Sequence, residues 1–366
     1  MEVSQNRTIT PNELKSALAY CVKSKRPAMI TGSPGIGKSD VVAALCAEMG
    51  GKLYDMRLGQ CDQTDLRGLP YYNKEKNVMD WAPPIDLPSE EEASKYPIVF
   101  LFLDELTSAG TSVMAAAYQL ILNRKVGTYT LPDNVVIVAA GNKDSDRGVT
   151  YRMPTPLANR FVHFELRIDF ASWVEWANLN RIHKDVVGFL SWSKNSLCDF
   201  DPKSNSKAFA TPRSWEFVSQ LLDDNCDDLT ATNIIAGTIG EGLALKFMAH
   251  RKHASKLPNP KGIMDGSVTR LEAKEISVMY SLMTSLNYEL VDFWEKVRNK
   301  KDEPLWHKAM DNVLGFVMDN FGIELQVMGI RTAIQQFNLP LTPKYLTNFK
   351  RYNDSVGGIL LKACAN

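Results

Sequence analysis

The chain has 366 residues, 45% of them hydrophobic and 23% charged, a composition typical of a folded protein with two or three packed units rather than of a disordered or fibrous one. Lysine plus arginine and aspartate plus glutamate each total 42, so no overall basic charge favours binding to nucleic acid or to an anionic membrane. No apolar run reaches the roughly 18 to 20 residues of a membrane span, and the N-terminus lacks the pattern of a signal peptide, so we expect a cytoplasmic protein with no membrane partner.

The first part of the chain alternates predicted helices and strands. A capping box at 10–13, with proline at the first helical position, predicts a helix through about residue 23. The apolar pattern then predicts a strand at 27–31, a helix at 38–49 and a second strand at 52–58. These elements form one βαβ unit, and its crossover places a glycine-rich turn at the carboxyl end of the first strand.

Three further strands and one helix are predicted before residue 167. Continuous apolar runs predict strands at 97–106 and 134–142, and a shorter strand follows at 162–166. Residues 112–127, rich in alanine and leucine and closed by glycine, are predicted to form a helix. Unbroken apolar strands are typical of a parallel sheet that is covered on both faces, so we expect a parallel sheet of five strands.

Beyond residue 169 the strand signal almost vanishes, and the second half of the chain is predicted to be helical. Helix patterns occur at 170–180, 184–195, 212–223, 230–253, 269–299, 304–321 and 323–337. The segment 256–266 has two prolines and two glycines in a polar stretch and is the best candidate for a linker.

The six cysteines lie far apart without a C-x-x-C pair, which argues against disulfides or a zinc site and favours buried thiols. His250 and His253 would bind a metal only with ligands from elsewhere in the chain.

A glycine-rich segment at 32–39, GSPGIGKS, matches the phosphate-binding pattern G-x-x-x-x-G-K-[ST] between a predicted strand and a predicted helix. Glycines let the backbone curl so that successive N–H groups face phosphate oxygens, and the following helix adds its positive N-terminal end. We therefore expect Lys38 to reach the β and γ phosphates and Ser39 to bind Mg²⁺. The alternative is a turn that only closes a βα unit. The residues assigned to the loop are Gly32, Ser33, Pro34, Gly35, Ile36, Gly37, Lys38 and Ser39.

Two acidic residues and one amide end the neighbouring predicted strands. Asp104 and Glu105 follow the apolar run at 99–103. Asp104 would lie near Ser39 and bind Mg²⁺ mostly through water, while Glu105 would polarise the attacking water. Asn142 closes the next strand and would hold that water or the γ phosphate. The alternatives are a carboxylate pair that caps a helix and an asparagine that forms a turn.

The order of these motifs resembles the AAA+ ATPases, and among them the MoxR-like group. Walker A corresponds to residues 32–39, Walker B to residues 100–105 and the sensor 1 position to Asn142. The resemblance implies an AAA+ P-loop NTPase core with a parallel five-stranded sheet, followed by a helical lid and additional C-terminal helices. The corresponding domains are an α/β nucleotide-binding subdomain at 1–167, an α-helical lid subdomain at 168–255 and a helical C-terminal extension at 267–366.

Two arginines take their expected roles from the same resemblance. The segment TPLANRF (155–161) is similar to the short helix that carries the family's arginine finger, which implies that Arg160 contacts the γ phosphate bound by a neighbouring subunit. Arg147 and Arg152 flank the same loop and are alternatives for that role. The segment ATPRSWEF resembles the sensor 2 segment of the lid, which implies that Arg213 closes on the nucleotide of its own subunit.

Residues 63–84 occupy the region where MoxR-like proteins insert a hairpin that faces the pore of the ring. The alternative is a surface loop of long charged residues. The sequence also departs from the MoxR-like pattern, because Leu106 and Thr107 stand where Asn-Arg usually follows Walker B, and a lysine rather than the frequent proline follows Asn142.

The resemblance implies a homo-oligomer, typically a hexameric ring, that binds ATP and Mg²⁺ and hydrolyses ATP. MoxR-like ATPases act in a chaperone-like manner and remodel or assist assembly of a protein partner, often one with a von Willebrand A domain. A nucleic acid motor or loader is an alternative, since basic segments occur at 250–256 and 296–301, but the neutral overall charge does not favour it. A third hypothesis is a scaffold that binds nucleotide without hydrolysis, against which Asp104 and Glu105 argue.

Overall fold

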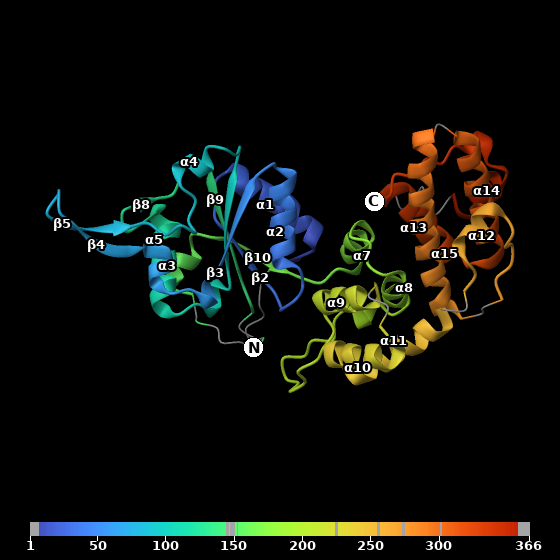
Figure 1. The fold of residues 1–366 in the computed structure, drawn as a ribbon, viewed down its shortest axis with the longest axis horizontal. Coiled ribbons are helices and arrows are strands. Elements are labelled where there is room, and N and C mark those ends of the chain that lie inside the picture. The colour runs from blue at the N-terminus through green and yellow to red at the C-terminus, as the bar shows by residue number, and fades with distance from the viewer. Residues whose placement is uncertain are drawn as a thin grey trace. The chain divides into compact units, whose positions relative to one another are not determined.

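The computed structural model describes residues 7–143, 146, 151, 153–223, 226–254, 257–272, 275–300 and 302–357. The chain divides into two compact units (Figure 1). The first contains Met1–Ser172 with the short segment Asp201–Ser204, and the second contains Trp173–Phe200 together with Asn205–Asn366. Within the described residues, no helix has both the length and the apolar character that crossing a membrane requires.

The first unit is built on a parallel sheet of six strands in the order β1-β10-β2-β9-β6-β3. The strands are β1 (Thr8–Ile9), β2 (Ala28–Thr31), β3 (Lys52–Arg57), β6 (Val99–Asp104), β9 (Val135–Gly141) and β10 (Val162–Leu166). The expected α/β fold is confirmed, but the sheet has six strands rather than five. The additional strand, β1, was not predicted because two residues are too few to show an apolar period.

Helices cover both faces of the sheet. Successive side chains of a strand point to opposite faces, so the apolar central strands contribute to a core on each side. Phe100 of β6 shares a core with α1 (Pro11–Lys23) and α2 (Lys38–Glu48), whereas its neighbour Leu101 packs on the other face with α5 (Thr111–Asn123). Both residues are fully buried. Burial on both faces accounts for the unbroken apolar runs of the central strands.

The capping box predicted at 10–13 is present at the start of α1. Thr10 Oγ1 accepts a hydrogen bond from Glu13 N at 3.2 Å, and Glu13 Oε2 accepts one from Thr10 N at 2.8 Å. The shorter elements of this unit are η1 (Leu58–Gln60), α3 (Gln63–Arg67), α4 (Glu90–Ala93), η2 (Leu106–Ser108) and α6 (Thr155–Ala158). Two of them, η1 and η2, follow the strands β3 and β6 and lie beside the site described below.

A long antiparallel hairpin of β4 (Leu69–Asn73) and β5 (Val78–Ala82) projects from the first unit, as the blue ribbon in Figure 1 shows. It occupies the region in which the resemblance implied a hairpin. Three of its apolar side chains, Leu69, Tyr72 and Met79, are more than half exposed.

A shorter hairpin follows α5. It joins β7 (Lys125–Val126) to β8 (Tyr129–Thr130). The helix was predicted to continue to about residue 127, but it ends at Asn123 because Arg124 adopts a left-handed conformation with φ of 53°. A residue in that region cannot continue a right-handed helix.

Among its described residues, the second unit contains helices joined by turns and loops, and no strand. Its α-helices begin with α7, which crosses the boundary between the units, and are α7 (Phe170–Leu179), α8 (Lys184–Trp192), α9 (Pro212–Asp223), α10 (Asp228–Ile239), α11 (Glu241–Ala254), α12 (Pro260–Asp265), α13 (Ile276–Lys300), α14 (Glu303–Asn320), α15 (Ile323–Arg331) and α16 (Thr347–Tyr352). Short 3-10 turns lie at Lys194–Leu197 and Pro343–Tyr345, and π turns at Thr332–Gln336 and Asn353–Gly357. The division of this region into a lid at 168–255 and an extension at 267–366 stays a prediction.

The predicted linker at 256–266 is wrong, because it contains the helix α12. Asn259 Oδ1 accepts a hydrogen bond from Lys261 N at 3.0 Å and caps the helix, and Gly266 ends it with φ of 86°. Ile263 is fully buried in the core of the second unit. Proline at the start and glycine just past the end of a helix are also favoured positions, so their density alone did not distinguish a helix from a loop.

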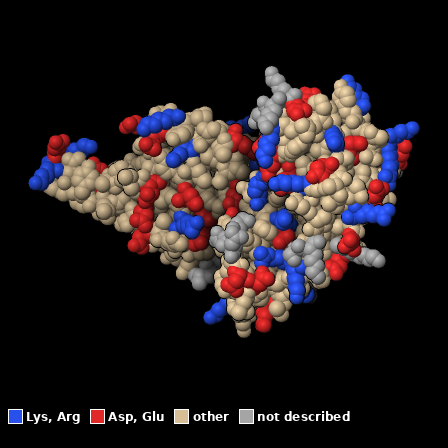
Figure 2. All heavy atoms as spheres, turned by 45° about the vertical axis from the view of Figure 1, so that its right-hand side comes forward, with Lys and Arg blue, Asp and Glu red and all other residues tan. Residues whose placement is uncertain are grey.

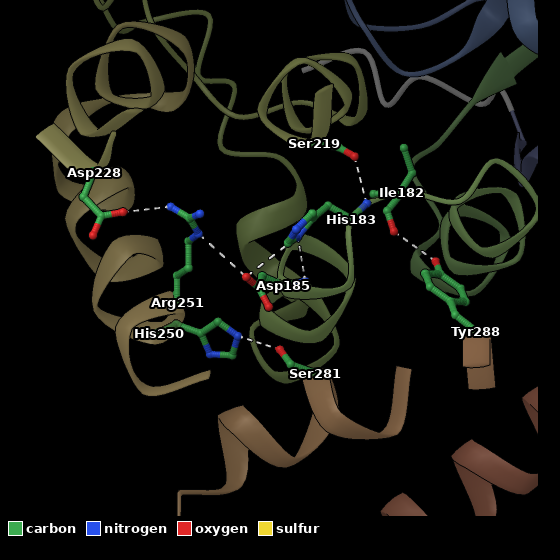
Figure 3. A network of polar contacts seen from close by, with 9 residues as sticks. All are labelled: Ile182, His183, Asp185, Ser219, Asp228, His250, Arg251, Ser281 and Tyr288. Atoms are coloured by element: carbon green, nitrogen blue, oxygen red, sulfur yellow. Dashed lines mark hydrogen bonds and ion pairs between the residues drawn. The ribbon is translucent and has the colours of Figure 1, made fainter. Parts of the chain in front are cut away.

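A polar network inside the second unit joins α8, α11 and α13 (Figure 3). His250 Nε2 lies 2.9 Å from Ser281 Oγ, and the next residue, Arg251, places its Nε 3.8 Å from Asp185 Oδ2. A Cβ added to Gly188 would overlap the backbone of Ser281. The glycine therefore permits the close approach of α8 to α13 on which this network depends.

Candidate functional site

The predicted phosphate loop connects β2 to α2 (Figure 1). Gly35 and Gly37 have φ of 72° and 90°, in the left-handed region that glycine adopts without steric cost. A Cβ on Gly32 would lie 3.2 Å from Leu166 O and 2.5 Å from Ile36 Cδ1, so this glycine permits close packing against β10. The loop continues directly into α2, whose N-terminal end carries the partial positive charge that favours a phosphate group.

Lys38 brings the loop together with the predicted sensor 1 residue. Its Nζ donates hydrogen bonds to Gly32 O at 2.7 Å, to Ser33 O at 3.0 Å and to Asn142 Oδ1 at 3.1 Å. The residue is only 9% exposed, so its ammonium group depends on such acceptors. The ends of β2 and β9 are adjacent in the sheet, which explains how residues distant in the sequence meet here.

Ser39 lies beside the predicted metal carboxylate. Its Oγ is 3.3 Å from Asp104 Oδ2, and Asp104 ends the central strand β6. Hydroxyl and carboxylate oxygens are the hard ligands that Mg²⁺ prefers, and Mg²⁺ usually keeps several waters and substrate phosphate oxygens in its coordination shell. The pair of residues therefore fits a Mg²⁺ ion bound together with a nucleotide.

Glu105 has an unusual backbone conformation, with φ of 57° and ψ of 30°. Its N–H donates a hydrogen bond to Asp104 Oδ1 at 2.9 Å. Its carboxylate lies against Gly59 of η1, where an added Cβ would overlap Glu105 Oε2. Left-handed residues other than glycine are uncommon and gather at functional sites, so this conformation is consistent with a constrained catalytic position.

Asp55 of β3 adds a third carboxylate that sequence reasoning missed. Burial raises the pKa of the Asp55 carboxyl above its ordinary value, the charge of Asp104 raises it further, and Arg57 acts in the opposite direction. Strand β3 pairs with β6, and Arg57 lies opposite Asp104 in the register. Nothing in the local pattern of β3 marked Asp55, because its proximity to Asp104 arises from the pairing of the two strands.

The two predicted arginines are both exposed. Arg160 follows α6, and its N–H donates to Leu157 O at 3.0 Å. Arg213 lies in the first turn of α9, in the second unit. The alternatives Arg147 and Arg152 lie outside the described residues. The roles of Arg160 and Arg213 at a nucleotide stay predictions.

Two further residues at the site carried little signal in the sequence. Gly59 lies in η1 and gives space to Glu105, while Thr107 of η2 packs against Gly141, next to Asn142. In the sequence, Thr107 marks only a departure from the MoxR-like pattern, and Gly59 belongs to no motif. Both act through contacts between segments that are far apart in the sequence, which local patterns do not reveal.

Comparison with protein families places this site in a known domain. Residues 28–168 match the model of the family described as "ATPase family associated with various cellular activities (AAA)". The match spans β2 to β10 and includes each predicted site residue except Arg213. This part of the chain is therefore similar to the AAA ATPase domain.

Individual proteins that this chain resembles have low sequence identity to it. Midasin of Giardia intestinalis is 26% identical over 261 residues, which cover 68% of this chain but 5% of midasin, so the chain spans about one twentieth of that relative. A mutant of RuvB from Thermotoga maritima is 15% identical with a TM-score of 0.35, over 69% of this chain and 76% of RuvB. NtrX from Brucella abortus in complex with ATP is 14% identical with a TM-score of 0.38, over 80% of this chain and 67% of NtrX.

Proposed function

We propose that this chain, whose residues 28–168 match the AAA ATPase family, is a subunit of a MoxR-like ring ATPase that hydrolyses ATP to remodel or assemble a protein partner. The observation that carries the proposal is the convergence of Lys38 with Asn142 and of Ser39 with Asp104 at the ends of neighbouring parallel strands. The phosphate loop binds the triphosphate through its N–H groups and through Lys38. Ser39 and Asp104 would hold a Mg²⁺ ion, which would supply positive charge to neutralise the phosphates.

Hydrolysis needs a group that orients the attacking water, and we assign this role to Glu105. Lys38 and Asn142 hold one another in the structure described here. A γ phosphate competes for the Lys38 ammonium, so its arrival releases the amide of Asn142 to bind the phosphate or the water. Phosphoryl transfer depends mainly on this kind of positioning and charge stabilisation.

We assign Arg160 to the active site of the neighbouring subunit and Arg213 to the nucleotide of its own subunit. The side chain of Arg160 is exposed and has no hydrogen-bond or ion-pair partner among the described residues, so it is available to an external anion. An arginine supplied in trans accelerates phosphoryl transfer by roughly 10³ to 10⁵. Sites shared head to tail between subunits generate a closed ring or an open spiral. Six subunits are typical of the AAA+ ATPases that the sequence resembles.

A protein partner is favoured over nucleic acid by the distribution of charge. On the face that Figure 2 shows, lysine and arginine side chains are interspersed with aspartate and glutamate, without a continuous basic stripe. The chain as a whole is neutral. A protein that tracks nucleic acid needs a basic surface to neutralise phosphates. The exposed β4–β5 hairpin is the element that we assign to contact with the partner, by analogy with the MoxR-like group, whose partners often carry a von Willebrand A domain.

Substitution Glu105→Gln tests the proposed activity. We expect ATP hydrolysis to fall by at least about a hundredfold while ATP binding persists, because positioned acid-base groups contribute roughly 10² to 10⁴ in rate. Glu90→Gln, an exposed residue of α4, is the matched control and should hydrolyse at the unmodified rate. Absence of phosphate release from the unmodified protein would instead support a scaffold that binds nucleotide without hydrolysis.

The same variant tests the partner. With ATP bound, Glu105→Gln should retain a protein that Lys38→Ala, which lacks the phosphate contact, does not retain. Retention that is lost on nuclease treatment, or stimulation of the ATPase by DNA or RNA that falls as salt rises, would favour the nucleic acid motor instead.

A further inference from the structure

Thr107 lies two residues after Glu105, in η2, with a side chain that is only 7% exposed. Its hydroxyl is buried and has no hydrogen-bond partner among the described residues. Among the described residues, the side chain of Thr107 therefore meets its neighbours through packing rather than through a hydrogen bond.

The side chain of Thr107 packs directly against the end of the sensor 1 strand. A Cβ added to Gly141 would lie 2.5 Å from Thr107 Oγ1 and 3.0 Å from Thr107 Cγ2. The absence of a side chain at position 141 therefore lets Thr107 touch the backbone of β9 next to Asn142. Interiors packed at this density pass on small shifts of one element to the next.

The main chain of Thr107 holds the segment that leads to Arg160. Thr107 O accepts a hydrogen bond from Tyr151 N at 2.6 Å. The chain then enters α6, and Leu157 and Phe161, on either side of Arg160, are buried in the same core as Leu106. Arg160 is thus anchored to the face of the sheet on which Thr107 lies, while Asn142 meets Lys38 at the phosphate loop.

We propose that Thr107 is a positioning residue that links Asn142 to Arg160. When a γ phosphate draws Asn142 and the end of β9, the side chain of Thr107 transmits the shift, and the bond to Tyr151 passes it to the segment that presents Arg160 to the neighbouring subunit. A subunit that binds ATP thereby sets the position of the arginine that acts on its neighbour. This inference rests on the proposed function, in which Arg160 acts in trans.

Mixed assemblies separate this role from any effect of Thr107 on its own active site. Acceptor subunits carry Arg160→Ala, so they hydrolyse ATP only where a neighbour supplies the arginine. Donor subunits carry Glu105→Gln, so they supply Arg160 but do not hydrolyse. The phosphate released by a mixture then measures only the arginines that the donors present.

Changes at the contact are made in the donor alone. Donors that also carry Thr107→Ala lose the contact with Gly141 and should activate the acceptors at about one tenth of the rate or less, because small misplacements of a catalytic group cost up to 10²-fold. Donors with Thr107→Val keep the branched shape and lose only a hydroxyl that has no partner among the described residues, so they should stay within about twofold of unmodified donors. Adding Gly141→Ala to the Thr107→Ala donor refills the gap and should recover activation.

The controls are ATP binding by each donor and its incorporation into mixed assemblies, measured by nucleotide titration and by size. Full activation by Thr107→Ala donors, or equal loss with Thr107→Ala and Thr107→Val, would overturn the inference while leaving the trans role of Arg160 intact. If donors with Glu105→Gln alone fail to activate the acceptors, the shared site itself is wrong, and this inference falls with it.

Discussion

Substitution Gly59→Ala tests whether the carboxylate of Glu105 has the catalytic role assigned to it. The new Cβ would overlap Glu105 Oε2, whereas the Cβ and Cδ atoms of Glu105 would lie at 3.5 and 3.6 Å, which is ordinary contact. Carbon and oxygen atoms in contact are roughly 3.5 Å apart, so the carboxylate oxygen must withdraw by about 1 Å. The change therefore displaces the reactive end of Glu105 and leaves the rest of the side chain in place.

The effects on folding and on catalysis should differ strongly. The group that must move is the end of a flexible side chain, so the free energy of unfolding should fall by only about 0.5 to 1.5 kcal/mol, the cost of an off-rotamer torsion. A misplacement of 1 Å lowers the rate by up to about 10²-fold. At 1.36 kcal/mol for each tenfold change, this loss corresponds to about 2.7 kcal/mol of transition-state stabilisation.

The assay is phosphate release at saturating ATP, with the KM for ATP measured alongside. We expect kcat to fall while KM stays within about twofold, because Lys38 and the phosphate loop are untouched. Gly110→Ala is the matched control, since a Cβ there meets nothing within 4 Å. An unchanged kcat in Gly59→Ala, or a loss confined to KM, would refute the assignment of Glu105.

Two other predictions concern the metal and the second unit. Ser39→Ala removes the hydroxyl that lies 3.3 Å from Asp104 Oδ2, so the Mg²⁺ concentration for half-maximal hydrolysis should rise by about tenfold or more. Burial lowers the pKa of His250 below its ordinary value, so below a pH of about 6.5 the unfolded chain binds a proton that the folded chain does not. The free energy of unfolding of the second unit should therefore fall as the pH drops from 7 toward 5, with a slope of up to about 1.4 kcal/mol per pH unit, and His250→Gln should remove this slope.

Each of these predictions has a control within the chain. Ser33→Ala, in the same loop, should leave the Mg²⁺ dependence unchanged, and a Ser39→Ala enzyme with unmodified Mg²⁺ dependence would contradict the metal assignment. Urea titrations at each pH measure the stability. Asp185 and Glu275 raise the pKa of His250, whereas the nearby His253 lowers it. Burial, which lowers this pKa, is the largest of the effects. His253→Gln should keep the slope, and a slope that persists in His250→Gln would show that another group titrates.

Motifs that depend on neighbours in the sequence were predicted well. The phosphate loop needs glycine at the positions with positive φ, so its pattern specified both its backbone and its place between β2 and α2. The capping box at Thr10 and the apolar run ending at Asp104 likewise predict a helix start and a strand from a few neighbouring residues. Breaks at a single residue were harder to predict. The apolar pattern predicted one helix at 230–253, but Gly240, with φ of 90°, divides it into α10 and α11.

Local patterns were therefore sufficient to predict the α/β class, the phosphate loop and the residues that end the central strands, since apolar period and loop chemistry involve only neighbouring residues. The contacts of Lys38 with Asn142, of Glu105 with Gly59 and of Thr107 with Gly141 could be known only from the folded chain. Strand order and close packing select which distant segments touch, and no local pattern specifies that choice. A missing side chain at a glycine has an effect only once its neighbours in space are fixed.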